Sequence, residues 1–437
     1  MSRQPTVTTR RTFLQRAAAT SAAILAAPAI GRTGLAAADR VPLANIGVGG
    51  KGWTDMIETS AGGDVVAICD VDRDRLDKAA ERFPKAKKFT DWRKLLEHKG
   101  IDAVTVSTPD HMHAPISLAA MELGLHVYAQ KPLTHSVHES REMARLAEQK
   151  NVVTQMGIQH HASTRIKNAV HLVQNGAIGK VSEVHTWTDR PGTFWKQGLD
   201  RPKQGQTAPA NLAWDLWLGV APQRPYVPQF YHPFHWRGWW AFGTGALGDM
   251  GCHILDPVFT ALQLGAPSQV RAEGPEPHPE SGPLWCVIHY TFPGTKFTTD
   301  QVRVVWYEAG KQPPRAIFKA PSNWKGSTNG VLFIGEKGNA FVGFPEPAEL
   351  FPREKFADYK LPEMPANNHY RQWTSAIIGQ EKAACPFAYS GSLTEAVLLG
   401  NVAFRSGETI RWNAKKLKAQ GVPKAEQFVK REYRTGW

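Results

Sequence analysis

The segment Gly47–Gly52 constrains the fold most strongly, because it has the spacing G-x-G-x-x-G directly after an apolar run. That run, residues 41–46, reads as a buried strand. The first glycine of the pattern permits a tight turn, the second lets the backbone approach a pyrophosphate, and the third lets a helix pack on the strand. Free N–H groups at the start of that helix attract phosphates. The segment therefore predicts a dinucleotide site that uses Gly47, Gly49, Gly50 and Gly52.

A second apolar run, residues 65–69, ends at Asp70, which lies 18 residues beyond Gly52. An acidic side chain at this place accepts hydrogen bonds from both hydroxyls of the adenosine ribose and repels a 2′-phosphate. Asp70 therefore favours NAD over NADP as the cofactor. A surface aspartate that merely follows a strand is the alternative interpretation.

Strands and helices continue to alternate as far as residue 155. Apolar runs at 101–106, 126–129 and 152–155 read as further strands, and the segments between them have the length of helices. This alternation predicts an α/β Rossmann domain, which is a doubly wound parallel sheet. Ligands of such sheets bind at the carboxyl ends of the strands. The cofactor-binding residues expected there are Thr108, Pro109, His113, Gln130 and Lys131.

From residue 181 onward the strands have alternating apolar and polar residues, as at 181–187, 286–292 and 302–307. The segments 368–378 and 393–404 read as helices that return to pack near the first domain. This change of pattern marks a second domain that mixes strands and helices.

The stretch between residues 187 and 240 is rich in loops and holds seven of the 15 tryptophans. Flat aromatic faces stack on the C–H faces of sugars, while a few polar groups fix the orientation. We interpret the group as the wall of a sugar site, with core packing as the alternative for any single tryptophan. The substrate-binding candidates in this stretch are Arg190, His232, His235, Trp236 and Arg237.

Asp249 and His253 lie four residues apart in a segment that reads as a helix, so they share one face and can point into one pocket. Oxidation of a secondary alcohol needs a base for the hydroxyl proton, and histidine is the side chain best matched to neutral pH. We assign His253 as the acid or base and Lys131 as the group that polarises the substrate oxygen or shares its proton. Asp249 would orient them. A structural histidine is the alternative.

Several of these motifs together resemble the Gfo/Idh/MocA family of glucose–fructose oxidoreductases and inositol dehydrogenases. They are the glycine turn, Asp70, Thr108-Pro109, Gln130-Lys131-Pro132 and Gly248–His253. The resemblance extends from about residue 41 to 412. It implies a Rossmann domain followed by an α+β domain whose large, open and mostly antiparallel sheet often forms the oligomer interface, so a homo-oligomer is expected. It also implies NAD(P) and a carbohydrate or polyol substrate.

One position departs from this resemblance. The family usually has Glu-Lys-Pro, whereas this chain has Gln130 before Lys131. Glutamine keeps a hydrogen-bonding group but lacks the charge that would favour a protonated Lys131. Whether this change alters the role of the lysine is left open by the sequence.

Residues 1–38 have the pattern of an export signal. The pair Arg10-Arg11 is followed by an apolar run at 17–30 and by small residues at 36–38 that suit cleavage. The apolar run is too short to span a bilayer, so no integral membrane segment is expected after processing. We expect export to the periplasm by the twin-arginine machinery. An amphipathic helix or a membrane anchor is the alternative.

The net charge of +13 does not indicate a nucleic-acid partner. Residues 1–38 hold five arginines and no acidic residue, so the remaining chain carries +8, and its basic residues are scattered except for a cluster after residue 421. The 16 histidines include close pairs, but no segment supplies the three or four convergent ligands that zinc needs, so no metal is expected. The four cysteines lie far apart and are expected in the core.

The predicted organisation is a twin-arginine signal at 1–38, an NAD-binding Rossmann domain at 39–160, a substrate-binding and oligomerisation domain at 161–420 and a basic tail at 421–437. The expected function is oxidation of a secondary hydroxyl on a sugar, sugar derivative or cyclic polyol. An NAD-assisted glycoside hydrolase, lyase or epimerase that recycles its cofactor in place is the second possibility, and a carbohydrate-binding or scaffold protein is the third. Because free NAD is a cytoplasmic resource, an exported enzyme is expected to hold its NAD tightly.

Overall fold

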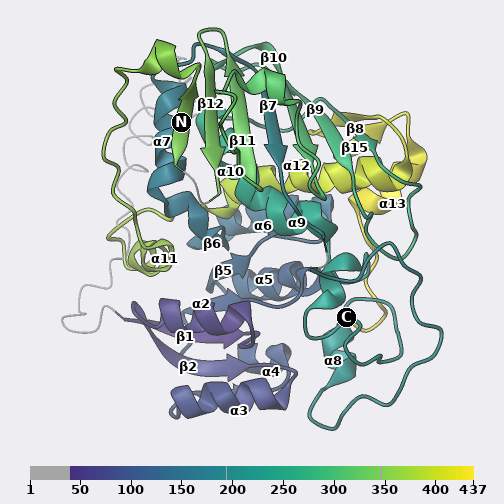
Figure 1. Cartoon of the computed structure of the whole chain (residues 1–437). Coiled ribbons are helices and arrows are strands. Elements are labelled where there is room, and N and C mark those ends of the chain that lie inside the picture. Colours follow the sequence, from purple (N-terminus) through teal and green to yellow (C-terminus); the bar gives the residue numbers. More distant parts are fainter. Residues whose placement is uncertain (1–39, 193, 345–346) are drawn as a thin grey trace, which may run out of the picture. The chain divides into compact units, whose positions relative to one another are not determined.

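The computed structural model describes residues 40–192, 194–344 and 347–437. The predicted export signal at 1–38 lies outside these described residues. The described chain begins with the predicted strand and glycine turn, and its two sheets follow one another along the sequence (Figure 1).

Six parallel strands form the first sheet, in the order β3-β2-β1-β4-β5-β6. Its strands are β1 (Val41–Ile46), β2 (Gly63–Cys69), β3 (Lys87–Phe89), β4 (Ala103–Val106), β5 (His126–Gln130) and β6 (Thr154–Gly157). The predicted Rossmann fold is confirmed. The strand order reverses between β1 and β4, and such a reversal opens a crevice at the carboxyl ends of the strands where ligands bind.

Helices connect these strands because the intervening segments carry helix signals. For example, Ser136 and Glu139 form a capping box at the start of α6 (Val137–Lys150), and Asn151 ends that helix in the left-handed conformation. The other helices of this domain are α2 (Lys51–Thr59), α3 (Arg73–Arg82), α4 (Trp92–Leu96) and α5 (His113–Glu122), with the 3₁₀ turn η1 (Asp110–Met112) before α5.

Nine strands form the second sheet, in the order β13-β12-β11-β7-β10-β9-β8-β14-β15. Among the described strands of this sheet only β7 and β10 pair in parallel, so the predicted mostly antiparallel sheet is confirmed. Its strands are β7 (Val181–Trp187), β8 (Gln269–Glu273), β9 (Val287–Pro293), β10 (Thr298–Tyr307), β11 (Gly330–Gly335), β12 (Asn339–Gly343), β13 (Ala348–Phe351), β14 (Ile410–Asn413) and β15 (Lys418–Gln420).

The helices of the second domain pack on this sheet and on the first domain. Helix α12 (Phe387–Ser406) contacts β8, α9 and also α6 of the first domain, and α11 (His369–Ile377) contacts α2. The predicted return of the C-terminal helices is thereby confirmed, and Figure 1 shows α12 in yellow alongside the sheet. The remaining elements are α7 (Thr164–Gln174), α8 (Trp214–Leu218), α9 (Gly245–Ile254), α10 (Asp256–Leu262), α13 (Glu426–Val429), η2 (Gln159–Ala162), η3 (His235–Gly238), η4 (Arg315–Phe318), η5 (Arg353–Phe356) and η6 (Pro423–Ala425).

The tryptophan-rich stretch forms a second hydrophobic core rather than a continuous sugar wall. Trp217 and Trp239 pack with Tyr231 and Phe242, and Trp187 belongs to another buried cluster. Of the seven tryptophans, only Trp217 and Trp236 line the main cavity among the described residues. The wall interpretation was therefore wrong for most of the group, because large aromatic surfaces are most strongly stabilised when neighbouring aromatic rings cover them.

The cysteines and the C-terminal tail are part of the packed structure. All four cysteines are buried as free thiols, as expected. The tail after residue 421 is docked on the protein, since Arg434 contacts Asp215 and Tyr433 donates to Glu139. Within the described residues, no helix has the length and apolar character needed to cross a membrane.

Candidate active site

A cavity of about 580 Å³ lies at the carboxyl ends of β1, β2, β4 and β5. This volume is typical of small-molecule and cofactor sites. The cavity is bounded on its other side by residues of the second domain, among them the segment 232–237 and His253. The expected cofactor residues that line it are Gly47, Gly49, Gly50, Asp70, Thr108, Pro109, His113, Gln130 and Lys131.

The glycine turn has a geometry that only glycine allows. Gly47 has a φ of +80°, and a Cβ there would lie 2.6 Å from the carbonyl oxygen of Ser107. A Cβ on Gly52 would lie 1.8 Å from the carbonyl oxygen of Gly47, so Gly52 permits the close approach of helix and turn without lining the cavity. Gly50 has a φ of +55° with no atom within 4 Å of an added Cβ, and it faces the cavity. This turn fits a pyrophosphate that lies against bare backbone.

Asp70 is fixed at the end of β2 by two backbone N–H groups. Val48 donates to one carboxylate oxygen at 2.9 Å and Asp72 donates to the other at 3.0 Å. Each oxygen keeps a further lone pair for a ribose hydroxyl. Burial raises the pKa of this carboxyl. Arg75 lies beside it, against Gly49 and within 3.4 Å of Asp72.

His113 connects two of the loops that line the cavity. One ring nitrogen lies 2.8 Å from the carbonyl oxygen of Pro132 and the other lies 2.8 Å from that of Thr108. Carbonyl oxygens only accept, so each contact is a hydrogen bond only where that ring nitrogen carries a proton, and the ring contacts both the loop after β4 and the loop after β5. His113 therefore helps to set the position of Lys131.

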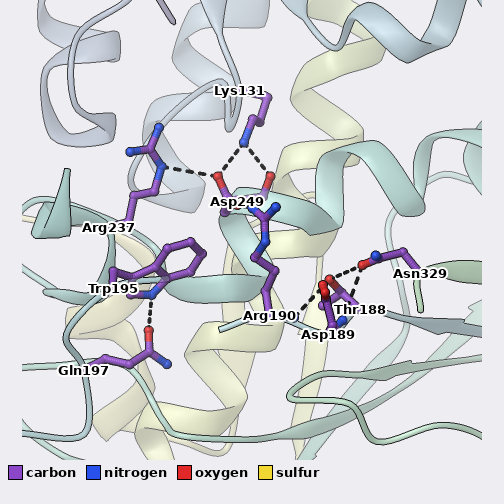
Figure 2. A network of polar contacts seen from close by, with 9 residues as sticks. All are labelled: Lys131, Thr188, Asp189, Arg190, Trp195, Gln197, Arg237, Asp249 and Asn329. Atoms are coloured by element: carbon purple, nitrogen blue, oxygen red, sulfur yellow. Dashed lines mark hydrogen bonds and ion pairs between the residues drawn. The ribbon is translucent and has the colours of Figure 1, made fainter. Parts of the chain in front are cut away.

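Lys131 is held by Asp249 of α9. Its ammonium donates to the backbone oxygen of Asp249 at 2.5 Å and to Oδ1 at 2.8 Å. Arg237 contacts the same oxygen through Nε at 3.3 Å, and Arg190 contacts Oδ2 at 3.1 Å. Figure 2 shows the three cationic side chains directed toward this one carboxylate. Burial would raise the pKa of Asp249, but Lys131 and the two guanidinium groups hold it well below its usual range.

His253 lies one turn further along α9 and lines the cavity. Burial and the nearby Lys131 ammonium lower its pKa well below the ordinary value of 6.5, so the ring is neutral at neutral pH. Its Nδ1 is buried and has no hydrogen-bond partner among the described residues. The rings of His160 and His253 pack edge to face, with their centroids 5.3 Å apart. A neutral imidazole in this position is suited to accept a proton.

The substrate candidates separate into two groups. Arg237 and Trp236 line the cavity near Asp249, and the Arg237 guanidinium lies 4.3 Å from the Trp236 ring. Arg190 reaches Asp249 from outside the cavity lining. His232 lines the cavity at another place, 3.1 Å from Asp72 and close to the ribose aspartate. Among the described residues, His235 is not part of the lining.

Sequence reasoning missed the residue that organises the cofactor loops, which is Asp55 of α2. Its side chain is fully buried and accepts from Ser107 at 2.7 Å and from Gln130 at 2.8 Å. Lys51 pairs with it at 2.9 Å and Tyr370 donates to it at 3.2 Å. Gln130 thus places its amide on Asp55, and the carboxylate beside Lys131 is supplied by Asp249. The sequence signal was the spacing of Lys51 and Asp55 on one helix face, which also describes ordinary surface pairs.

Within the part of the chain that the structure describes, no group of three or more histidine, cysteine, aspartate or glutamate side chains is arranged to hold a metal ion.

The chain matches family models in both domains. Residues 43–158 match the NAD-binding Rossmann fold of the Gfo/Idh/MocA oxidoreductase family, and residues 162–321 match the C-terminal alpha/beta domain of the same family. These two matches together span most of the described chain.

Individual relatives are more distant. Levoglucosan dehydrogenase of Pseudarthrobacter phenanthrenivorans is 27% identical over 179 residues, which is 41% of this chain and 37% of that protein. A glycosyl hydrolase family 109 protein of Shewanella sp. strain ANA-3 is 29% identical over 203 residues, which is 39% of this chain and 44% of that protein. The alignments thus span less than half the length of either relative.

The fold also matches solved structures. Levoglucosan dehydrogenase in complex with NADH and levoglucosan superposes with a TM-score of 0.56 at 16% identity, covering 85% of this chain and 99% of that one. WlbA dehydrogenase of Bordetella pertussis, solved with NADH and UDP-GlcNAcA, superposes with a TM-score of 0.61 at 16% identity, covering 86% and 99%. At this identity the likeness shows the shared fold, and the matches to both domain models show that the chain belongs to the Gfo/Idh/MocA oxidoreductase family.

Proposed function

We propose that this protein is an NAD-dependent oxidoreductase that acts on a secondary hydroxyl of a sugar, sugar derivative or cyclic polyol. The observation that carries the proposal is that Lys131 and His253 line the same cavity as the glycine turn. Neighbouring strands lie about 4.8 Å apart, so Lys131 after β5 is about 10 Å from the turn after β1, measured across the sheet. A dinucleotide that lies along this edge would present its nicotinamide to Lys131.

The residues present fit NAD. Gly50 leaves open space for the pyrophosphate, and Asp70 offers both carboxylate oxygens to the adenosine ribose. When bound, NAD supplies the hydride acceptor. The charge of Asp70 opposes a 2′-phosphate, although Arg75 lies close enough to offset part of that repulsion.

The protein side chains divide the remaining work. Lys131 is positioned by Asp249 to polarise the substrate oxygen through its ammonium. The neutral ring of His253 accepts the hydroxyl proton as the alcohol carbon is oxidised, and returns it in the reverse direction. Trp236 gives the cavity an apolar wall beside these groups.

A substrate panel tests the proposed reaction. Purified protein is incubated with NAD and with single sugars, methyl glycosides and inositols, while the absorbance of reduced cofactor is followed. We expect at least one of these compounds to reduce NAD in a reaction that Lys131→Ala abolishes. Absence of any NAD reduction across the panel, together with absence of NAD binding by calorimetry, would contradict the proposal.

A transient oxidation with the cofactor recycled in place is the second candidate. The observation that favours it is that the segment 232–237 borders the cavity and is held at two separate places. His232 contacts Asp72 near the ribose aspartate, and Arg237 contacts Asp249 at the catalytic end. A segment held at both places would keep the cofactor bound while it is recycled. The similarity to a glycosyl hydrolase family 109 protein supports the same candidate. Product analysis with nitrophenyl glycosides separates the two, because only the recycling enzyme releases nitrophenol without net NADH.

We further propose that NAD is bound during folding and dissociates slowly. Denaturation of protein purified without added cofactor, followed by an enzymatic assay of the supernatant, measures this directly. About one NAD(H) per chain is expected. A protein that is purified empty and accumulates free NADH during turnover would be an ordinary dehydrogenase that exchanges its cofactor.

Export by the twin-arginine pathway to the periplasm is proposed from Arg10 and Arg11. Replacement of both by lysine should leave the precursor, with residues 1–38 attached, in the cytoplasm. Fractionation and immunoblotting measure the outcome, and normal amounts of processed variant outside the inner membrane would contradict the assignment.

Assembly into a homo-oligomer through the second sheet is also proposed. Gln301 and Arg303 of β10 are exposed on one face of that sheet. Light scattering on the purified protein should give a multiple of the chain mass, and a monomeric mass at all concentrations would contradict the proposal.

A further inference from the structure

The catalytic end of the cavity carries more positive charge than the proposed reaction needs. Lys131, Arg190 and Arg237 surround the single carboxylate of Asp249, which leaves two unbalanced positive charges in this cluster. A reaction at a neutral hydroxyl requires only Lys131 and its partner. The inference drawn from this excess rests on the oxidoreductase function proposed above.

Neighbouring acids do not remove the excess. Asp110 lines the cavity, and Arg237 and Lys131 are near enough to oppose the rise in its pKa that burial causes, so counting Asp110 as charged still leaves one positive charge in excess. Asp55 is paired with Lys51 and Asp256 is paired with His161. The phosphates of NAD would lie at the glycine turn, two strands away from Lys131, so they would not neutralise the cluster either.

The two arginines have N–H groups left for a ligand. Arg237 contacts Asp249 through Nε alone, and Arg190 contacts it through one terminal nitrogen. Within the described residues, neither guanidinium has a second carboxylate partner. Arg237 is the one of the two that lines the cavity. Its remaining N–H groups form the fork that matches the geometry of a carboxylate.

Aromatic rings lie against these guanidinium groups. Arg237 lies 4.3 Å from the Trp236 ring and 4.8 Å from the Phe234 ring, and Arg190 lies 3.7 Å from the Phe194 ring. Stacking holds a guanidinium in one orientation while leaving its edge open, so less entropy is lost when an anion binds. The arrangement is therefore preorganised for a planar anion.

We propose that the substrate is an anionic sugar, in which Arg237 binds a carboxylate of the same ring whose hydroxyl contacts Lys131. Lys131 Nζ and Arg237 Nε bind the same oxygen of Asp249 at 2.8 and 3.3 Å, so they lie at most 6.1 Å apart. One sugar ring reaches both groups. Arg190 strengthens the positive potential from behind Asp249.

Matched sugar pairs test this assignment. Glucuronate against glucose and galacturonate against galactose are titrated into the NAD-loaded protein by calorimetry, and NAD reduction is measured in parallel. At least one uronate should bind at least tenfold more tightly than its neutral parent, and added salt should reduce the difference. Arg237→Gln should abolish the difference while NAD binding stays normal. The matched control Arg145→Gln, an exposed arginine of α6 outside the cavity lining, should keep it.

The outcomes separate this inference from the function on which it rests. Equal or weaker binding of both uronates overturns the anionic-sugar assignment, even if a neutral sugar is oxidised. Uronate binding that depends on Arg237 but gives no NAD reduction supports the anion site and contradicts the oxidoreductase function. Arg237→Lys, which keeps the charge but loses the fork, serves if Arg237→Gln fails to fold, and it should retain only part of the preference.

Discussion

Two buried carboxylates contact successive residues at the end of β5, Asp55 at Gln130 and Asp249 at Lys131, and they have opposite surroundings. Asp55 receives hydrogen bonds from a hydroxyl, an amide and a phenol as well as the Lys51 ammonium. Within the described chain, the carboxylate of Asp249 receives hydrogen bonds only from a lysine and two arginines. Both avoid the cost of an unpaired buried charge, but by different means.

The difference separates a cluster that supports the site from one that we propose to contact the substrate. The donors around Asp55 come from separate elements and are directed into the protein, so the cluster joins the glycine-turn helix, the ends of β4 and β5, and α11. The cations around Asp249 keep N–H groups available for a ligand. A closed cluster fixes geometry, whereas an open cluster of like charges attracts a ligand.

The largest expected effect separates the two carboxylates by stability. Asp55→Ala should lower the free energy of unfolding by about 3 kcal/mol, toward the lower end of the range for a broken buried ion pair because Lys51 is partly exposed. Asp55→Asn should lower the free energy of unfolding by less, since its amide oxygen can still accept a hydrogen bond from Lys51 or Ser107. Denaturant unfolding measures both. If Asp249→Asn destabilises the protein as much as Asp55→Asn, the contrast between a closed and an open cluster fails.

The next effect concerns turnover. Lys131→Ala and His253→Ala should each reduce turnover by at least about a hundredfold, because one side chain polarises the substrate oxygen and the other accepts its proton. Fold and NAD binding should remain, as judged by circular dichroism and calorimetry. Lys88→Ala and His171→Ala, which lie outside the cavity lining, are the matched controls. Near-normal turnover in either site variant would remove that residue from the reaction.

A smaller effect concerns the choice of cofactor. Asp70→Ala should narrow the preference for NAD over NADP by about 1–3 kcal/mol, because a like charge beside the 2′-phosphate is removed. Arg75→Ala should widen the preference for NAD over NADP, since it removes a cation beside Asp70 that would offset part of the repulsion of the 2′-phosphate. The ratio of the two dissociation constants measures both changes. Tighter binding of NADP by the unaltered protein would show that the role of Asp70 is misassigned.

The smallest effect concerns pH. Burial, the Lys131 ammonium and then His160 lower the pKa of His253, so protonation that removes the base occurs only below the ordinary histidine range. The kcat/KM profile should therefore stay level as pH falls through 6.5 and decline only at lower pH. His160→Phe removes a neighbour whose protonation opposes that of His253, and should move this decline to higher pH. A decline centred at or above 6.5 in the unaltered protein would mean that His253 is not held neutral.

The sequence predicted the fold well because periodicity and glycine spacing are local signals. The order of β1 and β2 around Gly47–Gly52 follows directly from such signals, as does the change to alternating strands after residue 181. The pairing of Asp249 with Lys131 could be predicted from motifs, since each residue lies in its own recognisable segment.

Other parts of the site could not be predicted from local patterns. Tyr370 reaches Asp55 across 315 positions of the chain, and nothing around either residue indicates the contact. The tryptophans of residues 187–240 were open to two interpretations, because core packing and sugar stacking favour the same residue type. The partner of Gln130 could not be predicted either, because the Gln130 amide donates to Asp55, which lies on the separate helix α2.

The segment 232–237 has a kinetic consequence. Two of its residues, five positions apart, make contacts at separate places along the cavity: His232 with Asp72 and Arg237 with Asp249. A ligand covered by such a segment would escape freely only while both contacts are broken. If the two contacts break independently, the probability of that open state is the product of their separate opening probabilities. A sugar bound by Arg237 would keep one contact region occupied. The departure of the cofactor would then be slowest while the sugar is present, which imposes an order on release: sugar first and dinucleotide last.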